Sequence, residues 1–145
     1  MKSLITGAGG YIGSALAEVL AAAGDELVLH YRNSNPDHDP LRNASVTEPT
    51  NLHIDLAEQE ISLEQLADVD AVFHCAGIAH QRAEELDYQR VNYEATLNLA
   101  KQCRQAGVKR FVFLSSVKAE TAVTPYGYYK SRTEISLQEM ESQTM

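Results

Sequence analysis

The chain has 145 residues, of which 44% are hydrophobic and 22% are charged. This composition is that of one ordinary globular domain, and it excludes a disordered tail, a collagen-like repeat and a small disulfide-bonded scaffold. Twenty acidic against twelve basic residues give a net charge of −8, which argues against a nucleic-acid-binding protein. The apolar runs are too short to span a membrane, and no signal peptide is predicted. Two cysteines without metal or redox spacing fit a reducing, cytoplasmic setting.

Short apolar runs alternate along the chain with segments of helical periodicity. The first helical segment, for example, carries Ile12, Leu16, Val19 and Leu20 on one face, and Gly24 follows as a C-terminal stop. Such alternation predicts an α/β fold, a Rossmann-type doubly wound parallel sheet with helices on both faces. In chain order we expect strand 2–6, helix 11–23, strand 27–30, a loop over 33–50, strand 52–55, helix 63–67, strand 70–75, helix 87–106, strand 109–114 and a helix from about residue 126.

The first strand is followed by a glycine-rich motif, TGAGGYIG, over residues 6–13. Its glycines are Gly7, Gly10 and Gly13, with Tyr11 and Ile12 between the last two. Glycine lets the backbone approach a pyrophosphate closely, and the N-terminus of the following helix offers free N–H groups to the anion. A glycine-rich turn without a ligand is the alternative. The flanking strand and helix favour a dinucleotide site.

The second strand ends without an acidic residue. An NAD-preferring site normally places Asp or Glu there to bind the adenosine ribose hydroxyls. Arg32 stands nearby instead and can pair with a 2′-phosphate through charge-assisted hydrogen bonds. The sequence therefore favours NADP(H) and leaves NAD(H) open. The alternative for Arg32 is a solvated side chain.

A third cluster follows the fifth strand. Tyr126 and Lys130 form Y-x-x-x-K, which places them on one face of a helix, and Ser116 lies at the end of the preceding strand. A free tyrosine has a pKa near ~10, and a neighbouring ammonium together with a positive nicotinamide favours the phenolate that a general base requires. Lys130 would also hold the nicotinamide ribose, and Ser116 would hydrogen-bond the substrate oxygen. We predict these three residues to be catalytic.

From Lys2 to about Met140, the chain resembles the extended short-chain dehydrogenase/reductase family, in its nucleotide-sugar branch of NAD(P)-dependent epimerases, dehydratases and reductases. The segments that carry the resemblance are TGAGGYIG (6–13), HCAG (74–77), FVFLSSVKAE (111–120) and PYGYYK (125–130). The resemblance implies that Asp55 accepts a hydrogen bond from the adenine amino group, although an Asp that caps a turn is the alternative. The remaining residues that it places along the cofactor are Leu56, Cys75, Ala76 and Gly77.

The resemblance also implies an activity. It is hydride transfer at a carbon of a nucleoside-diphosphate sugar, with Tyr126 shuttling the hydroxyl proton. Family members are longer, so residues 1–145 are expected to form an NAD(P)-binding domain without the C-terminal substrate half. Nine residues separate Ser116 from Tyr126, fewer than in related enzymes.

Other readings of the chain stay open. They are a non-catalytic NADP(H)-binding regulatory or sensor module, and a protein-interaction scaffold. A homodimer is a further expectation that the family resemblance implies. In the same family Asn92 supports the active-site architecture, although a surface amide is an alternative. The histidines at 30, 38, 53, 74 and 80 show no metal-site spacing, so no metal is expected.

Overall fold

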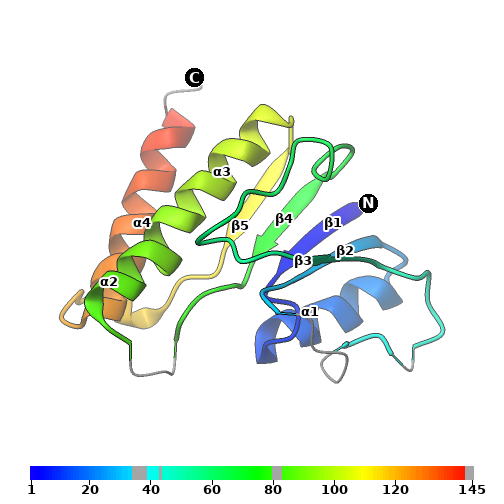
Figure 1. Cartoon of the computed structure of the whole chain (residues 1–145), viewed down its shortest axis with the longest axis horizontal. Coiled ribbons are helices and arrows are strands. Elements are labelled where there is room, and N and C mark those ends of the chain that lie inside the picture. Colours follow the sequence, from blue (N-terminus) through cyan, green and yellow to red (C-terminus); the bar gives the residue numbers. More distant parts are fainter. Residues whose placement is uncertain (34–38, 43, 80–82, 143–145) are drawn as a thin grey trace.

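A computed structural model describes residues 1–33, 39–42, 44–79 and 83–142. Within these ranges the chain forms five strands and a set of helical segments (Figure 1). In chain order they are β1 (Lys2–Thr6), α1 (Tyr11–Ala22), β2 (Glu26–Tyr31), β3 (Thr50–His53), β4 (Ala71–His74), α2 (Glu85–Asp87), the π-helical segment η2 (Tyr88–Glu94), α3 (Ala95–Gln105), β5 (Arg110–Phe113), the 3₁₀ turn η3 (Val117–Ala119) and α4 (Pro125–Ser142).

The five strands form one parallel sheet in the order β3-β2-β1-β4-β5. The chain winds from β1 outward to β3, then returns to the other side of β1 for β4 and β5. The carboxyl ends of β1 and β4 therefore diverge at a topological switch point, where ligands of open α/β sheets bind.

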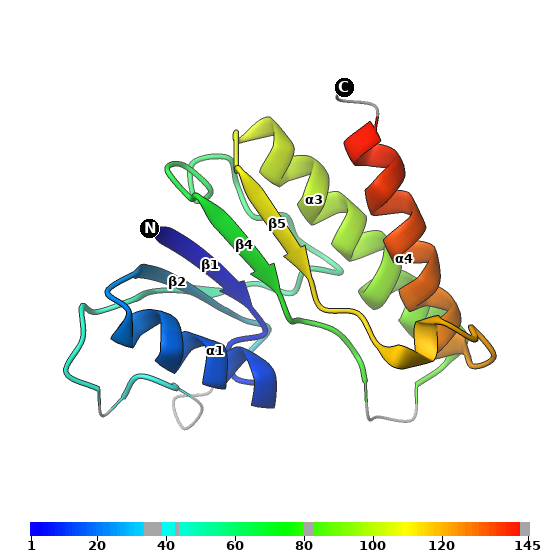
Figure 2. The ribbon, with the colours of Figure 1, turned by 180° about the vertical axis from the view of Figure 1, so that it is seen from behind.

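Both faces of the sheet are covered, because successive residues of each strand point to opposite sides. Leu4 of β1 packs in a cluster with Leu99 and Cys103 of α3. Its neighbour Ile5 packs in a second cluster with Ala17 and Ala21 of α1. Figure 2 shows α1 on one side of the sheet and α3 and α4 on the other. The expected doubly wound α/β fold is confirmed.

Most expected elements are present, with ends that differ by at most two residues. The third strand is shifted and runs over Thr50–His53 rather than 52–55. Helix 87–106 begins earlier, at Glu85, and contains the π-helical segment. Part of the expected loop over 33–50, together with His38 and His80, lies outside the described residues.

The helix expected over 63–67 is wrong, since residues 63–68 form consecutive turns. Leu66 N donates to Ser62 O at helical spacing, but Ala67 N and Val69 N donate to acceptors only three residues earlier. Asp68 then has a φ of 62°, which is incompatible with a right-handed helix. Five residues are too few to propagate a helix once the chain turns back toward the sheet.

Candidate dinucleotide-binding and active site

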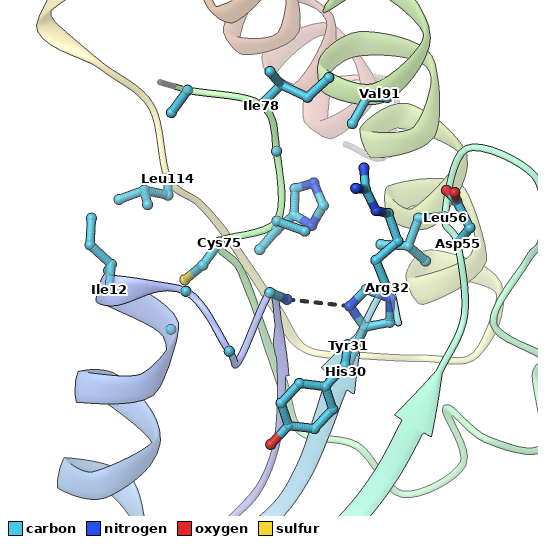
Figure 3. A pocket seen from close by; sticks show the side chains of 18 of the residues that line it. Ile12, His30, Tyr31, Arg32, Asp55, Leu56, Cys75, Ile78, Val91 and Leu114 are labelled. Atoms are coloured by element: carbon cyan, nitrogen blue, oxygen red, sulfur yellow. Dashed lines mark hydrogen bonds between the residues drawn. The ribbon is translucent and has the colours of Figure 1, made fainter. Parts of the chain in front are cut away.

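A pocket opens at the carboxyl ends of the strands, where the switch point lies (Figure 3). Its volume is about 660 Å³, within the range of small-molecule and cofactor sites. With the exception of Lys130, all of the predicted cofactor-binding residues line it: Gly7, Gly10, Tyr11, Ile12, Gly13, Arg32, Asp55, Leu56, Cys75, Ala76 and Gly77. The three predicted catalytic residues, Ser116, Tyr126 and Lys130, are not in the lining.

The three motif glycines differ in how much room the structure leaves for a side chain. Gly7 has a φ of 67°, and a Cβ there would lie 2.9 Å from the backbone of Ala76. A Cβ at Gly13 would overlap the Gly7 carbonyl oxygen. Gly10 has an ordinary φ of −81° and would place a Cβ 3.3 Å from the same oxygen. The fold therefore requires Gly7 and Gly13, whereas Gly10 is the position with the most room for a side chain.

His30 forms a hydrogen bond with the backbone of this glycine loop. Its Nδ1 accepts a hydrogen bond from Gly7 N at 3.3 Å, and its Nε2 lies 2.7 Å from the Ile54 carbonyl oxygen, to which it donates (Figure 3). Burial lowers the pKa of His30, partly offset by the hydrogen bond to Ile54 and the charge of Asp55. A neutral imidazole with its proton on Nε2 satisfies both contacts. His30 thus ties the loop after β1 to the end of β3.

At the end of β2, Tyr31 and Arg32 face different environments. The Tyr31 ring stacks on His53 with ring centroids 5.4 Å apart and packs in the α1-side cluster, although the residue also lines the pocket. The Arg32 side chain is exposed on the pocket side (Figure 3). Among the described lining residues, Asp55 is the one carboxylate. Near the carboxyl end of β2, the pocket wall therefore carries the Arg32 guanidinium and no acidic side chain from that strand.

Asp55 already has a structural partner. Its Oδ1 accepts from Ala57 N at 3.0 Å, and its carbonyl oxygen accepts from Glu58 N and Gln59 N. The turn-capping alternative is therefore present in this structure. It also fixes the carboxylate at the pocket wall, beside Leu56.

A buried hydrogen-bond chain crosses the sheet behind the pocket. Ala76 N donates to Thr6 Oγ1 at 3.1 Å, which leaves the Thr6 hydroxyl proton to be donated to His74 Nδ1 at 2.7 Å. The Thr96 hydroxyl donates to Asn92 O at 2.9 Å, so Thr96 Oγ1 must accept from His74 Nε2, 2.8 Å away. This chain leaves His74 neutral with its proton on Nε2. Burial, with smaller contributions from the charges of Lys130 and His30, lowers its pKa to about 3.

Asn92 anchors the loop after β4. Its side chain accepts from Ile78 N and donates to Ile78 O, both at 2.8 Å. The residue is 1% exposed, so the expectation that it supports the site holds and the surface-amide alternative does not. The Asn92 carbonyl oxygen also accepts from the hydroxyl of Thr133 in α4, which connects this loop to the helix that carries Tyr126.

Two of the predicted catalytic residues, Tyr126 and Lys130, lie together beside the end of β5. Lys130 Nζ donates to Leu114 O at 2.7 Å and lies 6.0 Å from the centre of the Tyr126 ring. Desolvation lowers the pKa of Lys130 to about 8, partly offset by Cys75 and Glu134. Leu114 lines the pocket, so Lys130 does not line the pocket itself but contacts the backbone of a residue that does. Ser116 caps the turn η3, whose end leads to α4 through only five further residues, 120–124.

Some pocket residues were not among the predicted site residues. Gly9, His74 and Leu114 lie inside the quoted motifs but were given no role, whereas Tyr31, Asn33, Ala57, Ile78, Ala79, Val91 and His30 lie outside them. The one signal that could have found His30 and His74 is a polar residue at the carboxyl end of an apolar strand, since β2 and β4 flank β1. Within the residues that the structure describes, no group of three metal-ligating side chains occurs.

The fold and this pocket define a dinucleotide-binding α/β protein. The model of the NAD dependent epimerase/dehydratase family matches residues 3–143, and the chain belongs to that family. No helix in the described part of the chain is long and apolar enough to cross a membrane.

Curated relatives include enzymes that act on nucleotide sugars. The chain is 36% identical over 124 residues to the UDP-glucose 4-epimerase of Klebsiella pneumoniae, covering 80% of this chain and 89% of that sequence. It is 33% identical over 132 residues to the UDP-glucose 4-epimerase of Vibrio cholerae, covering 86% and 37%. A 2-alkyl-3-oxoalkanoate reductase of Stenotrophomonas maltophilia is 32% identical over 116 residues, covering 80% and 33%. The chain thus spans about a third of the length of the last two relatives.

The chain also superposes on solved structures of proteins that bind NAD and a nucleotide sugar. The UDP-glucose-4-epimerase from Stenotrophomonas maltophila, with bound NAD and formylated UDP-arabinopyranose, superposes with a TM-score of 0.85 at 26% identity. That match covers all of this chain and 50% of the other. MoeE5 in complex with UDP-glucose and NAD gives 0.78 at 28% identity, covering 92% and 47%. The family is NAD-dependent, and both of these neighbours bind NAD.

Proposed function

We propose that this chain is the dinucleotide-binding part of an oxidoreductase or epimerase that prefers NADP(H) and acts on a nucleoside-diphosphate sugar. The observation that carries the proposal is the position of α4. It brings Tyr126 and Lys130 to the end of β5, where Lys130 contacts the backbone of the pocket residue Leu114. The net charge of −8 supports a partner other than nucleic acid, and the resemblance supports a cytoplasmic homodimer.

A dinucleotide suits this pocket, because the glycine loop and the N-terminus of α1 line it at the switch point of the sheet. The clashes of a Cβ at Gly7 and Gly13 with backbone atoms hold this loop in one tight conformation. Gly7 and Gly10 would hold the diphosphate, with Asp55 and Leu56 at the adenine and residues 75–77 along the nicotinamide half. When bound, the dinucleotide supplies the hydride acceptor or donor.

The residues of the chain would handle the proton. Oxidation of a sugar alcohol removes a hydride from carbon and a proton from oxygen, and Tyr126 would take that proton as its phenolate. Ser116 Oγ accepts from Lys118 N, so its own hydroxyl proton is available to the substrate oxygen. Lys130, whose ammonium lies beside the Tyr126 ring, would stabilise the negative phenolate and hold the nicotinamide ribose.

We predict that Tyr126→Phe separates chemistry from binding. In a full-length form that contains the substrate half, turnover of UDP-glucose with NADP⁺ should fall by about 10²–10⁴-fold, the usual contribution of general acid–base catalysis. Calorimetric titration should show unchanged dinucleotide affinity, because Tyr126 does not line the pocket. Lys130→Ala should lower both, and Ser116→Ala only the rate. Tyr128→Phe, an exposed tyrosine of the same helix, is the control.

Turnover of Tyr126→Phe within about threefold of the parent would mean that another group moves the proton.

A non-catalytic NADP(H)-binding module is the second candidate function for this chain. It is favoured by the position of Ser116, Tyr126 and Lys130 outside the pocket lining. Dinucleotide binding by the parent without turnover of any nucleotide sugar would support that candidate.

The cofactor preference rests on Arg32. Its side chain is exposed beside the pocket, and Tyr31, the residue before it, faces the α1-side core. We predict that Arg32→Ala weakens NADPH binding by about tenfold to a hundredfold, the loss of one charge-assisted contact, and changes NADH binding much less. Fluorescence titration with both cofactors measures this. Equal losses for both would assign Arg32 a packing role and overturn the preference.

A further inference from the structure

Lys118 occupies a rigid position between two proposed catalytic residues. Its backbone N donates to Ser116 Oγ at 3.3 Å, and its carbonyl oxygen accepts from Ala122 N at 3.2 Å. The first turn of α4 abuts the same carbonyl, since a Cβ at Gly127 would overlap it. The backbone of Lys118 is therefore held against both Ser116 and the residue next to Tyr126.

The Lys118 side chain places a second ammonium near Tyr126. Its Nζ lies 5.9 Å from the centre of the Tyr126 ring, and Lys130 Nζ lies 6.0 Å from that centre. The two groups differ in their surroundings. Lys130 is buried and donates to Leu114 O, whereas Lys118 is exposed. Among the described residues Lys118 has no ion-pair partner within 4.0 Å and no side-chain hydrogen bond.

We propose that Lys118 determines substrate specificity by binding an anionic oxygen of the substrate beside Tyr126. The inference rests on the proposed function, because it takes the Tyr126 hydroxyl as the place where the substrate reacts. An exposed ammonium with no carboxylate partner is available for a charge-assisted hydrogen bond, and its rigid backbone limits the positions it can reach. A nucleotide sugar carries suitable oxygens in two places, on its diphosphate or on a sugar carboxylate.

The test follows Lys118 directly by NMR of the chain with ¹³Cε-labelled lysine. The Lys118 signal is assigned by its loss in Lys118→Gln, and Lys101, exposed on α3, is the internal control. Three probes are titrated: UDP-glucuronate, UDP-glucose and glucuronate. We expect UDP-glucuronate to shift the Lys118 signal saturably and to leave Lys101 in place. A response to UDP-glucose would identify the diphosphate, and a response to glucuronate the carboxylate. A Lys118 signal that moves no more than that of Lys101 with all three would overturn the proposal.

Affinity gives a second, independent measurement. Lys118→Gln should weaken UDP-glucuronate binding by roughly tenfold to a hundredfold, while Lys118→Arg retains most of it and Lys101→Gln all of it. NADPH affinity should be the same in Lys118→Gln and the parent, because Lys118 does not line the pocket. Equal UDP-glucuronate affinity in Lys118→Gln and the parent contradicts the role of Lys118. Absence of dinucleotide binding by the parent would contradict the proposed function instead.

Discussion

At the scale of single residues, the motif glycines have separable roles. Gly7 and Gly13 are required by the fold, since a Cβ at either meets backbone atoms. Gly10 has an ordinary backbone conformation and is the N-cap of α1, and a Cβ there would make only a tight 3.3 Å contact with the Gly7 carbonyl oxygen, which a small shift relieves. A side chain at Gly10 would stand where a diphosphate approaches the helix N-terminus. The site and the fold can therefore be perturbed independently within one loop.

We predict that Gly10→Val lowers dinucleotide affinity at least about tenfold and lowers the melting temperature less than Gly13→Ala does, because much of the blocked surface belongs to the ligand. Gly13→Ala should instead destabilise the fold by several kcal/mol, since its methyl group overlaps a carbonyl oxygen. Calorimetric titration and thermal unfolding measure the two effects. Ala15→Val, exposed on α1, is the control for added bulk. Unchanged NADPH affinity in Gly10→Val would mean that the diphosphate binds elsewhere.

At the scale of elements, the helical stretch from α2 to α3 is interrupted where it meets the site. Residues Tyr88–Glu94 are π-helical, and such segments are frequent at functional sites. Asn92 in this segment holds the backbone of Ile78, and Gly77 lies close to the same side chain. The π-helical segment thereby positions the loop that forms one wall of the pocket.

We predict that Asn92→Ala costs about 1–3 kcal/mol of stability, because it leaves the Ile78 N–H and carbonyl without their partner. NADPH affinity should also fall, since Gly77 and Ile78 line the pocket. Urea unfolding and calorimetric titration measure both quantities. Asn98→Ala removes an exposed amide of α3 and should change neither. If the two variants behave alike, Asn92 does not anchor the loop.

At the scale of the whole molecule, two buried histidines hold the sheet together across its switch point. His30 joins β2 to the glycine loop and to the end of β3, and His74 joins β4 to β1 and α3. Both accept hydrogen bonds at Nδ1 and must be neutral to do so. Their protonation therefore opposes folding.

We predict that stability falls as pH decreases from about 6.5 toward 3. The pKa of His74 is about 3 in the folded chain against 6.5 unfolded, so the unfolded chain binds the extra proton within that window. The contribution is complete above pH 6.5 and amounts to as much as about 5 kcal/mol by linkage. Urea unfolding at several pH values measures it. The pH dependence should be shallower in His74→Gln, and an equally steep one would exclude His74 as its source.

Local sequence rules were sufficient where one segment carries the whole signal. The apolar run of β1, the glycines from 7 to 13 and the spacing of Tyr126 and Lys130 each depend on residues a few positions apart. The prediction of a helix over 63–67 was wrong because the short apolar pattern there buries Leu66 within a series of turns instead of a helix. Periodicity reports which residues are buried, but it does not distinguish a short helix from turns.

The sequence by itself determined the parallel α/β fold, the position of the pocket proposed as the dinucleotide site and the identity of the residues proposed to act there. These depend on backbone periodicity and on glycine, whose conformational effects are local. Only the tertiary structure decided how distant side chains pair. Thr6 and His74 are 68 residues apart, and the tautomer of His74 follows from donors and acceptors on three separate elements. Likewise, Tyr31 turns into the core and Lys118 reaches Tyr126 only because packing of the sheet and α4 sets their directions.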